Sequence, residues 1–143
     1  MKHNSESLLE VKDLTVNFFS KEFSIDAVRS ISFSIERGKT LALVGESGSG
    51  KSVTAKSLMQ LNPSNSIYGS DSKINLELEN NIVDVLSLKK AKELEIVRGG
   101  AISMIFQEPM ASFAPAITIG NQMVEQLLIH TSLSKKEAAE LSV

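Results

Sequence analysis

The feature that most constrains this sequence is a glycine-rich octapeptide, Gly45-Glu-Ser-Gly-Ser-Gly-Lys-Ser52. It matches the pattern G-x-x-x-x-G-K-[ST] at every fixed position. Residues 40–45 before the loop form a short apolar run, typical of a strand buried on both faces of a sheet. Residues 52–61 after it have helical spacing, and Asn62-Pro63 ends that pattern. A strand, a glycine loop and a helix in this order predict an α/β fold.

The residue types in this loop predict binding of phosphate oxygens. Glycines allow the backbone to approach a ligand closely, and successive amide N–H groups can form an anion-binding nest. The helix that follows adds unpaired N–H groups. Lys51 would place a charge between the β- and γ-phosphates, and the Ser52 hydroxyl would be a ligand of Mg²⁺. The predicted ligand is a nucleoside triphosphate with Mg²⁺. The predicted contact residues are Gly45, Glu46, Ser47, Gly48, Ser49, Gly50, Lys51, Ser52 and Val53.

The alternative is a flexible glycine turn with a solvated lysine. That interpretation does not explain why a lysine and a hydroxyl follow the last glycine directly.

Hydrophobic patterns elsewhere predict strands and helices in alternation. The predicted strands cover residues 9–18, 27–35, 74–78, 82–86 and 101–106, with a slip in register at Asp13 in the first. The predicted helices cover residues 87–97 and 119–130, and a last helix begins after Ser134, where Glu137 completes a capping box. Residues 62–72 are polar and predict a surface loop. The whole predicts a three-layer α/β core with an antiparallel part contributed by the first strands.

Composition excludes several other classes of site and partner. The 143 residues include no cysteine, which excludes disulfides, thiolate metal sites and cysteine nucleophiles. The two histidines are too few and too far apart in sequence to suggest a metal site. The 15 basic and 17 acidic residues leave a net charge of −2, so no nucleic acid partner is expected. The most apolar stretch, residues 101–129, is interrupted by polar residues and prolines, so we expect no membrane-spanning helix in it.

Three stretches resemble one known family. They are residues 45–58 (GESGSGKSVTAKSL), residues 97–115 (VRGGAISMIFQEPMASFAP) and residues 118–122 (TIGNQ), which a helix and His130 follow. In them the chain resembles the ATP-binding subunit of an ABC transporter, most closely the dipeptide, oligopeptide and glutathione importer branch. The resemblance implies the N-terminal part of one P-loop NTPase domain with a mixed sheet. Its core would cover residues 8–117, and its helical subdomain would start within residues 118–143.

The resemblance also implies roles for residues outside the loop. In the family, a glutamine at the end of a strand reaches Mg²⁺ and the attacking water, and here that position is Gln107. Gln107 and Lys51 are therefore the expected catalytic residues, with Ser52 and Gln107 at the metal. The family stacks adenine on an aromatic residue near the end of the first strand. Phe18 matches that position best, and Phe19 and Phe23 remain alternatives.

The implied function is ATP binding in a subunit that hydrolyses ATP and powers import of peptides or similar small solutes. The implied partners are membrane permease subunits, a second ATP-binding subunit and, indirectly, a solute-binding protein, at the cytoplasmic face of the inner membrane. The family's signature segment, Asp-Glu strand and switch histidine do not occur in these 143 residues. We therefore expect this chain to bind Mg-ATP weakly, without meaningful turnover. A non-catalytic nucleotide-binding fragment and a different P-loop NTPase are the alternatives.

Overall fold

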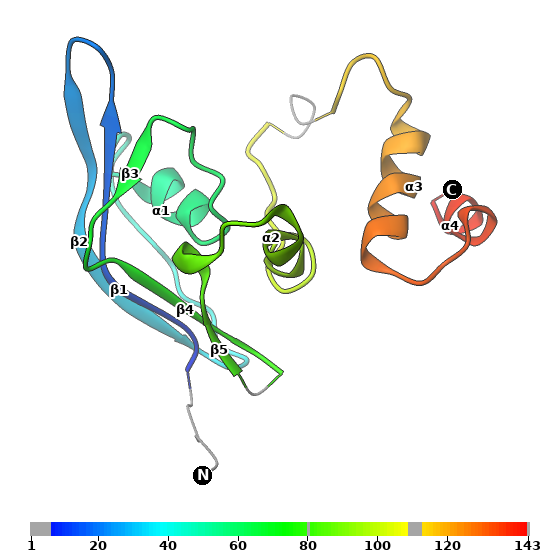
Figure 1. The fold of residues 1–143 in the computed structure, drawn as a ribbon, viewed down its shortest axis with the longest axis horizontal. Helices are drawn as coiled ribbons and strands as arrows, with labels where there is room; N and C mark the ends of the chain where they lie inside the picture. Colours follow the sequence, from blue (N-terminus) through cyan, green and yellow to red (C-terminus); the bar gives the residue numbers. More distant parts are fainter. Residues whose placement is uncertain (1–6, 80, 109–112, 143) are drawn as a thin grey trace. The chain divides into compact units, whose positions relative to one another are not determined.

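The computed structural model describes residues 7–79, 81–108 and 113–142, which fall into two compact units (Figure 1). The first unit ends at Val97, and the second begins at Arg98. The strands of the first unit are β1 (Ser7–Phe19), β2 (Ser24–Glu36), β3 (Ser66–Tyr68), β4 (Lys73–Leu78) and β5 (Asn81–Asp84). Its helices are α1 (Lys51–Ser57), the short 3₁₀ helix η1 (Val85–Ser87) and α2 (Ala91–Val97). The second unit contains α3 (Ile119–His130) and α4 (Lys135–Leu141).

The first unit is built on an antiparallel sheet with the strand order β2-β1-β4-β5, in which β3 also pairs with β1. Together with the helices, this sheet gives the α/β class that the sequence predicts. One face of β1 carries four buried side chains at alternating positions within each half of the strand. They are Leu9, Val11, Leu14 and Val16. With Ile74, Val85 and Val97, which are fully buried, they form the core of this unit.

The two halves of β1 are joined by a shift in register, which confirms the predicted slip at Asp13. The pairing with β2 shifts between Val11 and Leu14, and Asp13 has a φ of 45°. On the facing strand Ser30 has a φ of 47°, and its hydroxyl donates to the Asp13 carboxylate at 3.3 Å. Irregularities of this kind bend a strand pair. Figure 1 accordingly shows β1 and β2 as a long, curved hairpin, and α1 packs against β2.

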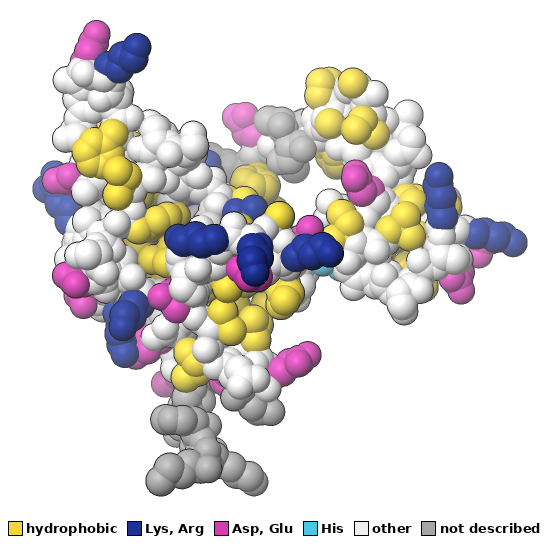
Figure 2. Space-filling model, in the orientation of Figure 1, with side chains coloured by type: hydrophobic (Ala, Val, Ile, Leu, Met, Phe, Trp, Pro, Cys, Tyr) yellow, Lys and Arg dark blue, Asp and Glu magenta, His cyan; other side chains and the backbone are white. Residues whose placement is uncertain are grey.

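Two apolar segments predicted as buried strands are not strands in this structure. Residues 40–45 and 101–106 belong to no strand, and both are largely exposed: Val44 is 90% exposed and Ile105 97%. A strand buried on both faces requires a hydrogen-bonded neighbour and a covering layer. Within the described residues, one isolated bridge between Arg98 and Ile102 is the only strand-like pairing of either segment. Figure 2 shows hydrophobic side chains on the surface of the described residues.

The prediction of a loop over residues 62–72 is also partly wrong, because this segment contains β3. This strand has three residues, and it pairs with Val16, Asn17 and Phe18 of β1. Two predicted helices are shorter than expected. The helix after the glycine loop ends at Ser57, and α2 begins at Ala91.

The helices of the second unit follow the sequence closely. The bounds of α3 are the predicted ones, and α4 begins after Ser134 with the predicted capping box. The backbone N–H of Ser134 donates to the Glu137 carboxylate at 2.8 Å, and the Ser134 hydroxyl accepts from the backbone N–H of Glu137 at 3.4 Å. No helix within the described residues combines the length and the apolar character that crossing a bilayer requires.

Candidate functional site

The glycine loop of residues 45–52 curls back on itself directly before α1. The Ser49 N–H donates to the Glu46 carbonyl at 3.2 Å, which closes a turn at residues 47–48. Gly48 and Gly50 have φ values of +81° and +90°, in the left-handed region that favours glycine. Gly50 is the N-cap of α1, so the loop leads straight into the first turn of the helix.

The loop is seated against β2 at Gly50. A Cβ atom added to Gly50 would lie 2.4 Å from the carbonyl oxygen of Ala27 and 3.4 Å from Cγ2 of Val28. Only glycine therefore fits this position without moving the strand. The sequence analysis did not predict Ala27 and Val28 as neighbours of the loop. Neither the sequence of the glycine loop nor that of β2 indicates that the two segments lie close together.

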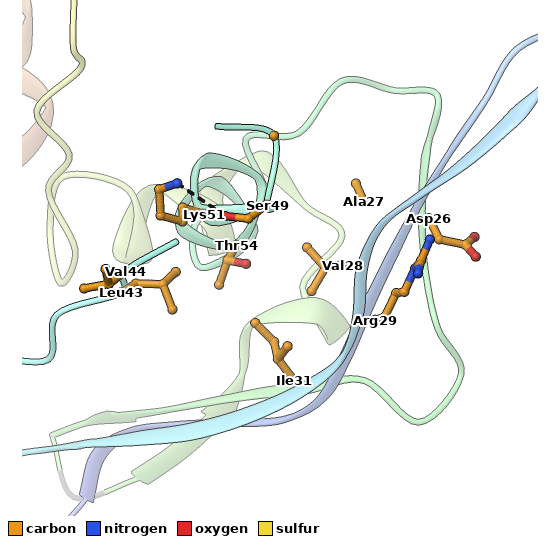
Figure 3. A pocket seen from close by; sticks show the side chains of 11 residues that line it. Asp26, Ala27, Val28, Arg29, Ile31, Leu43, Val44, Ser49, Lys51 and Thr54 are labelled. Atoms are coloured by element: carbon orange, nitrogen blue, oxygen red, sulfur yellow. Dashed lines mark hydrogen bonds between the residues drawn. The ribbon is translucent and has the colours of Figure 1, made fainter. Parts of the chain in front are cut away.

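Lys51 reaches back over the start of the loop. Its ammonium donates to the carbonyl oxygens of Gly45 and Glu46, at 2.7 Å each, and to the Ser49 hydroxyl at 3.3 Å (Figure 3). An ammonium has three N–H donors, and these three acceptors can occupy all of them. The positive charge is thus held at the centre of the curled loop rather than extended into solvent.

A cavity of about 460 Å³ opens beside the loop (Figure 3). Its volume lies within the range of small-molecule sites. Residues of the loop, of β2, of α1 and of the segment before the loop contribute to its wall. They are Asp26, Ala27, Val28, Arg29, Ile31, Leu43, Val44, Gly48, Ser49, Lys51 and Thr54.

The donors at the start of α1 fit a phosphate group. The first backbone bond of α1 runs from the Thr54 N–H to the Gly50 carbonyl at 2.8 Å. The N–H groups of Lys51, Ser52 and Val53 therefore have no partner inside the helix. These donors, beside the positive charge that Lys51 holds at the loop, suit phosphate oxygens.

The donor set also allows Mg²⁺, provided that phosphate shares in its coordination. Ser52 is exposed at the start of α1, and its hydroxyl forms no hydrogen bond with the residues that the structure describes. The described residues contain no group of three or more His, Cys, Asp or Glu that could hold a metal ion. A Mg²⁺ ion at Ser52 would take most of its ligands from phosphate oxygens and water, as this ion commonly does.

The three candidate phenylalanines are not among the described residues that line the cavity. Phe18 is half-buried near the end of β1, where it pairs with Ile25 of β2 and Ser66 of β3. Phe19 is 43% exposed and Phe23 is 58% exposed. The choice of a base-stacking residue among them stays a prediction.

Gln107 belongs to the second unit, where it lies exposed in the irregular segment after residues 101–106. Its proposed contact with the metal and with water stays a prediction. Gln122, to which the sequence analysis gave no role, holds the backbone of residues 114–117. Its side-chain amide accepts from the Ala114 N–H at 2.9 Å and donates to the carbonyls of Ala114 and Ile117, at 3.1 and 2.8 Å.

Comparison with known proteins gives a consistent result. The protein family described as "ABC transporter" matches residues 28–142. The glutathione import ATP-binding protein of Escherichia coli (strain K12) is 42% identical over 142 residues, covering 96% of this chain and 23% of that protein. The dipeptide transport ATP-binding protein of Lactococcus lactis subsp. cremoris (strain MG1363) is 46% identical over 134 residues, covering 93% of this chain and 37% of that protein. The chain thus spans well under half the length of these relatives.

Proposed function

This chain belongs to the ABC transporter family, and we propose that its glycine loop binds Mg-ATP as part of an ATP-hydrolysing transport subunit. The observation that carries this proposal is the ring formed by Lys51 and the loop. The ammonium contacts two loop carbonyls at 2.7 Å, at the edge of a cavity and next to the unpaired N–H groups of α1. This arrangement presents a positive charge and several N–H donors together, which a triphosphate would satisfy.

The proposed roles follow from the chemistry of each side chain. The loop residues and Val53 bind the phosphates through backbone N–H groups, and Lys51 contributes the charge. Ser52 and Gln107 hold Mg²⁺, which neutralises phosphate charge when it is bound. Gln107 orients water, and Phe18 stacks on adenine.

We also propose the setting in which this site works. The names of the relatives refer to glutathione import and dipeptide transport, which favours import of peptides or similar small solutes. The partners are permease subunits, a second ATP-binding subunit and, indirectly, a solute-binding protein. The protein acts at the cytoplasmic face of the inner membrane.

Titration of the full chain with Mg-ATP tests the binding role. We expect saturable binding that weakens by about 10- to 150-fold in Lys51→Ala, because a hydrogen bond to a charged group contributes about 1.5–3 kcal/mol. Lys92→Ala is the matched control, since Lys92 is an exposed lysine of α2 outside the loop. Equal affinities in the two variants, or no saturable binding in the unmodified chain, would refute the proposal.

A second measurement tests the expectation that this chain binds nucleotide without turning it over. Phosphate release is assayed on the same samples that are used for binding, so nucleotide binding and hydrolysis are measured separately. We expect release at the background rate, because water activation needs a base in addition to phosphate binding. Steady release well above background that disappears in Lys51→Ala would contradict this expectation.

A further inference from the structure

We propose that Ser49 is a positioning residue for Lys51: its hydroxyl ties the ammonium to the closed loop before any nucleotide arrives. This inference rests on the proposed function of the loop and adds a division of roles within it. The G-x-x-x-x-G-K-[ST] pattern leaves Ser47 and Ser49 equivalent, as two of its four free positions. The structure separates them.

The first observation is the contact with the ammonium. The Ser49 hydroxyl accepts a hydrogen bond from the Lys51 Nζ atom at 3.3 Å, and Figure 3 shows the two side chains converging. The other two acceptors are backbone carbonyls, which any residue at those positions would provide. Ser49 is therefore the one side chain among the described residues whose hydrogen bond with the ammonium a substitution can remove.

The second observation is the contact across the loop. A Cβ atom built on Gly45 would lie 2.6 Å from the Ser49 hydroxyl oxygen and 3.3 Å from the Ser49 Cβ. The side chain of Ser49 therefore crosses the loop and touches its first residue. Because the Gly45 carbonyl is itself an acceptor for Lys51, this contact links two of the three groups that hold the ammonium.

Ser47 shows neither contact. It is exposed, and its hydroxyl forms no hydrogen bond with any residue that the structure describes. Two serines of the same loop thus have different roles. Only the side chain of Ser49 organises the lysine side chain.

This organisation has a consequence for binding. A free lysine side chain loses rotamer freedom when it is fixed on a ligand, and holding it beforehand reduces that cost. The Ser49 hydroxyl is a third acceptor beside the two carbonyls, so the ammonium is already held over the loop before the ligand binds. Removing the hydroxyl would return part of the ordering cost to the binding step, which should weaken binding.

The test compares Ser49→Ala, Ser49→Thr and Ser49→Val in the full chain, without nucleotide. The readout is acylation of Lys51 by an N-hydroxysuccinimide ester, measured by peptide mass spectrometry relative to Lys92 in the same molecule. A lysine side chain with fewer hydrogen bonds to the loop is more accessible to the ester, so we expect Lys51 labelling to rise about 2- to 10-fold in Ser49→Ala and Ser49→Val. Ser49→Thr keeps the hydroxyl and should restore the original rate. Labelling that does not change in Ser49→Ala, or that Ser49→Val restores as well as Ser49→Thr, overturns the role of the hydroxyl.

Titration with Mg-ATP on the same variants separates this inference from the proposed function. We expect Ser49→Ala to weaken binding about 2- to 10-fold, and Ser47→Ala to weaken it less. An unmodified chain that fails to bind Mg-ATP overturns the proposed function, whatever the labelling shows. Binding that is equally affected in Ser47→Ala and Ser49→Ala overturns the division of roles between the two serines.

Discussion

Replacing Gly50 with alanine tests how the glycine loop is seated in the fold. Gly50 combines a positive φ of +90° with a close approach to β2, where an added Cβ would lie 2.4 Å from the Ala27 carbonyl oxygen. Asp26 and Val28, on either side of Ala27, pair with β1. The carbonyl therefore cannot move alone, and either the loop or the strand pair must shift.

The expected cost has two parts. An L-residue in the left-handed region loses roughly 1–2 kcal/mol. The added Cβ would also lie 1.0 Å inside the 3.4 Å at which ordinary contact begins, and forcing extra atoms into a packed site typically costs about 1–3 kcal/mol. The free energy of unfolding should therefore fall by about 2–5 kcal/mol in Gly50→Ala.

Gly38→Ala isolates the cost of placing an L-residue in the left-handed region. Gly38 also has a positive φ, of +74°, but an added Cβ would meet nothing within 4 Å. Its variant should lose only about 1–2 kcal/mol. The gain from lower entropy of the unfolded chain applies to both glycines, so it cancels from the difference.

Urea unfolding followed by circular dichroism gives both free energies. Mg-ATP titration of the folded variants then shows whether the displaced loop still binds. We expect Gly50→Ala to be the less stable variant by about 1–3 kcal/mol and to lose Mg-ATP binding, and Gly38→Ala to keep it. Equal destabilisation by the two substitutions would show that β2 does not seat the loop.

Two further predictions concern hydrogen bonds elsewhere in the chain. Ser134→Ala removes the N-cap of α4. The free energy of opening that hydrogen exchange measures for the α4 amides should therefore fall by about 1 kcal/mol, while that for the β1 amides stays unchanged. Persistence of the original α4 protection would contradict the capping role. Hydrogen bonds from Lys12 and Asn75 lower the pKa of Glu10 below 4.5. Because the pKa of Glu10 is lower in the folded than in the unfolded protein, ionised Glu10 stabilises the folded state. This stabilisation is complete above the pKa of the unfolded protein and is lost as the pH falls through the pKa of the folded protein. NMR titration should show the Glu10 midpoint rising in Lys12→Ala, and a midpoint that stays in place would exclude Lys12 as its main cause.

Local patterns predicted the parts of the fold that local contacts determine. The bounds of α3 and the capping box at Ser134 depend on residues within a few positions of each other. The two strands of the β1–β2 hairpin were also predicted, because apolar and polar residues alternate over most of each and the strands follow each other directly. Even the slip at Asp13 was visible as a break in the alternation.

Elements that depend on distant partners were predicted less well. Residues 40–45 and 101–106 have the apolar composition of buried strands, but composition does not supply the strands that must pair with them. The three residues of β3 were missed for the opposite reason. Their polar surroundings predict a loop, and only pairing with β1 makes them a strand.

The glycine loop keeps its curl although residues 40–45 are not in a sheet, and the origin of its contacts explains why. The bonds from Lys51 to Gly45 and Glu46 span six and five residues, and the bond from Lys51 to Ser49 spans two. Positive φ values at two glycines supply the reversal of the chain. The distant contact between Gly50 and β2 is made with a hairpin that is itself formed by neighbouring strands. The curl of the loop therefore depends mainly on residues within the motif, whereas the position of Gln107 depends on contacts that lie outside it.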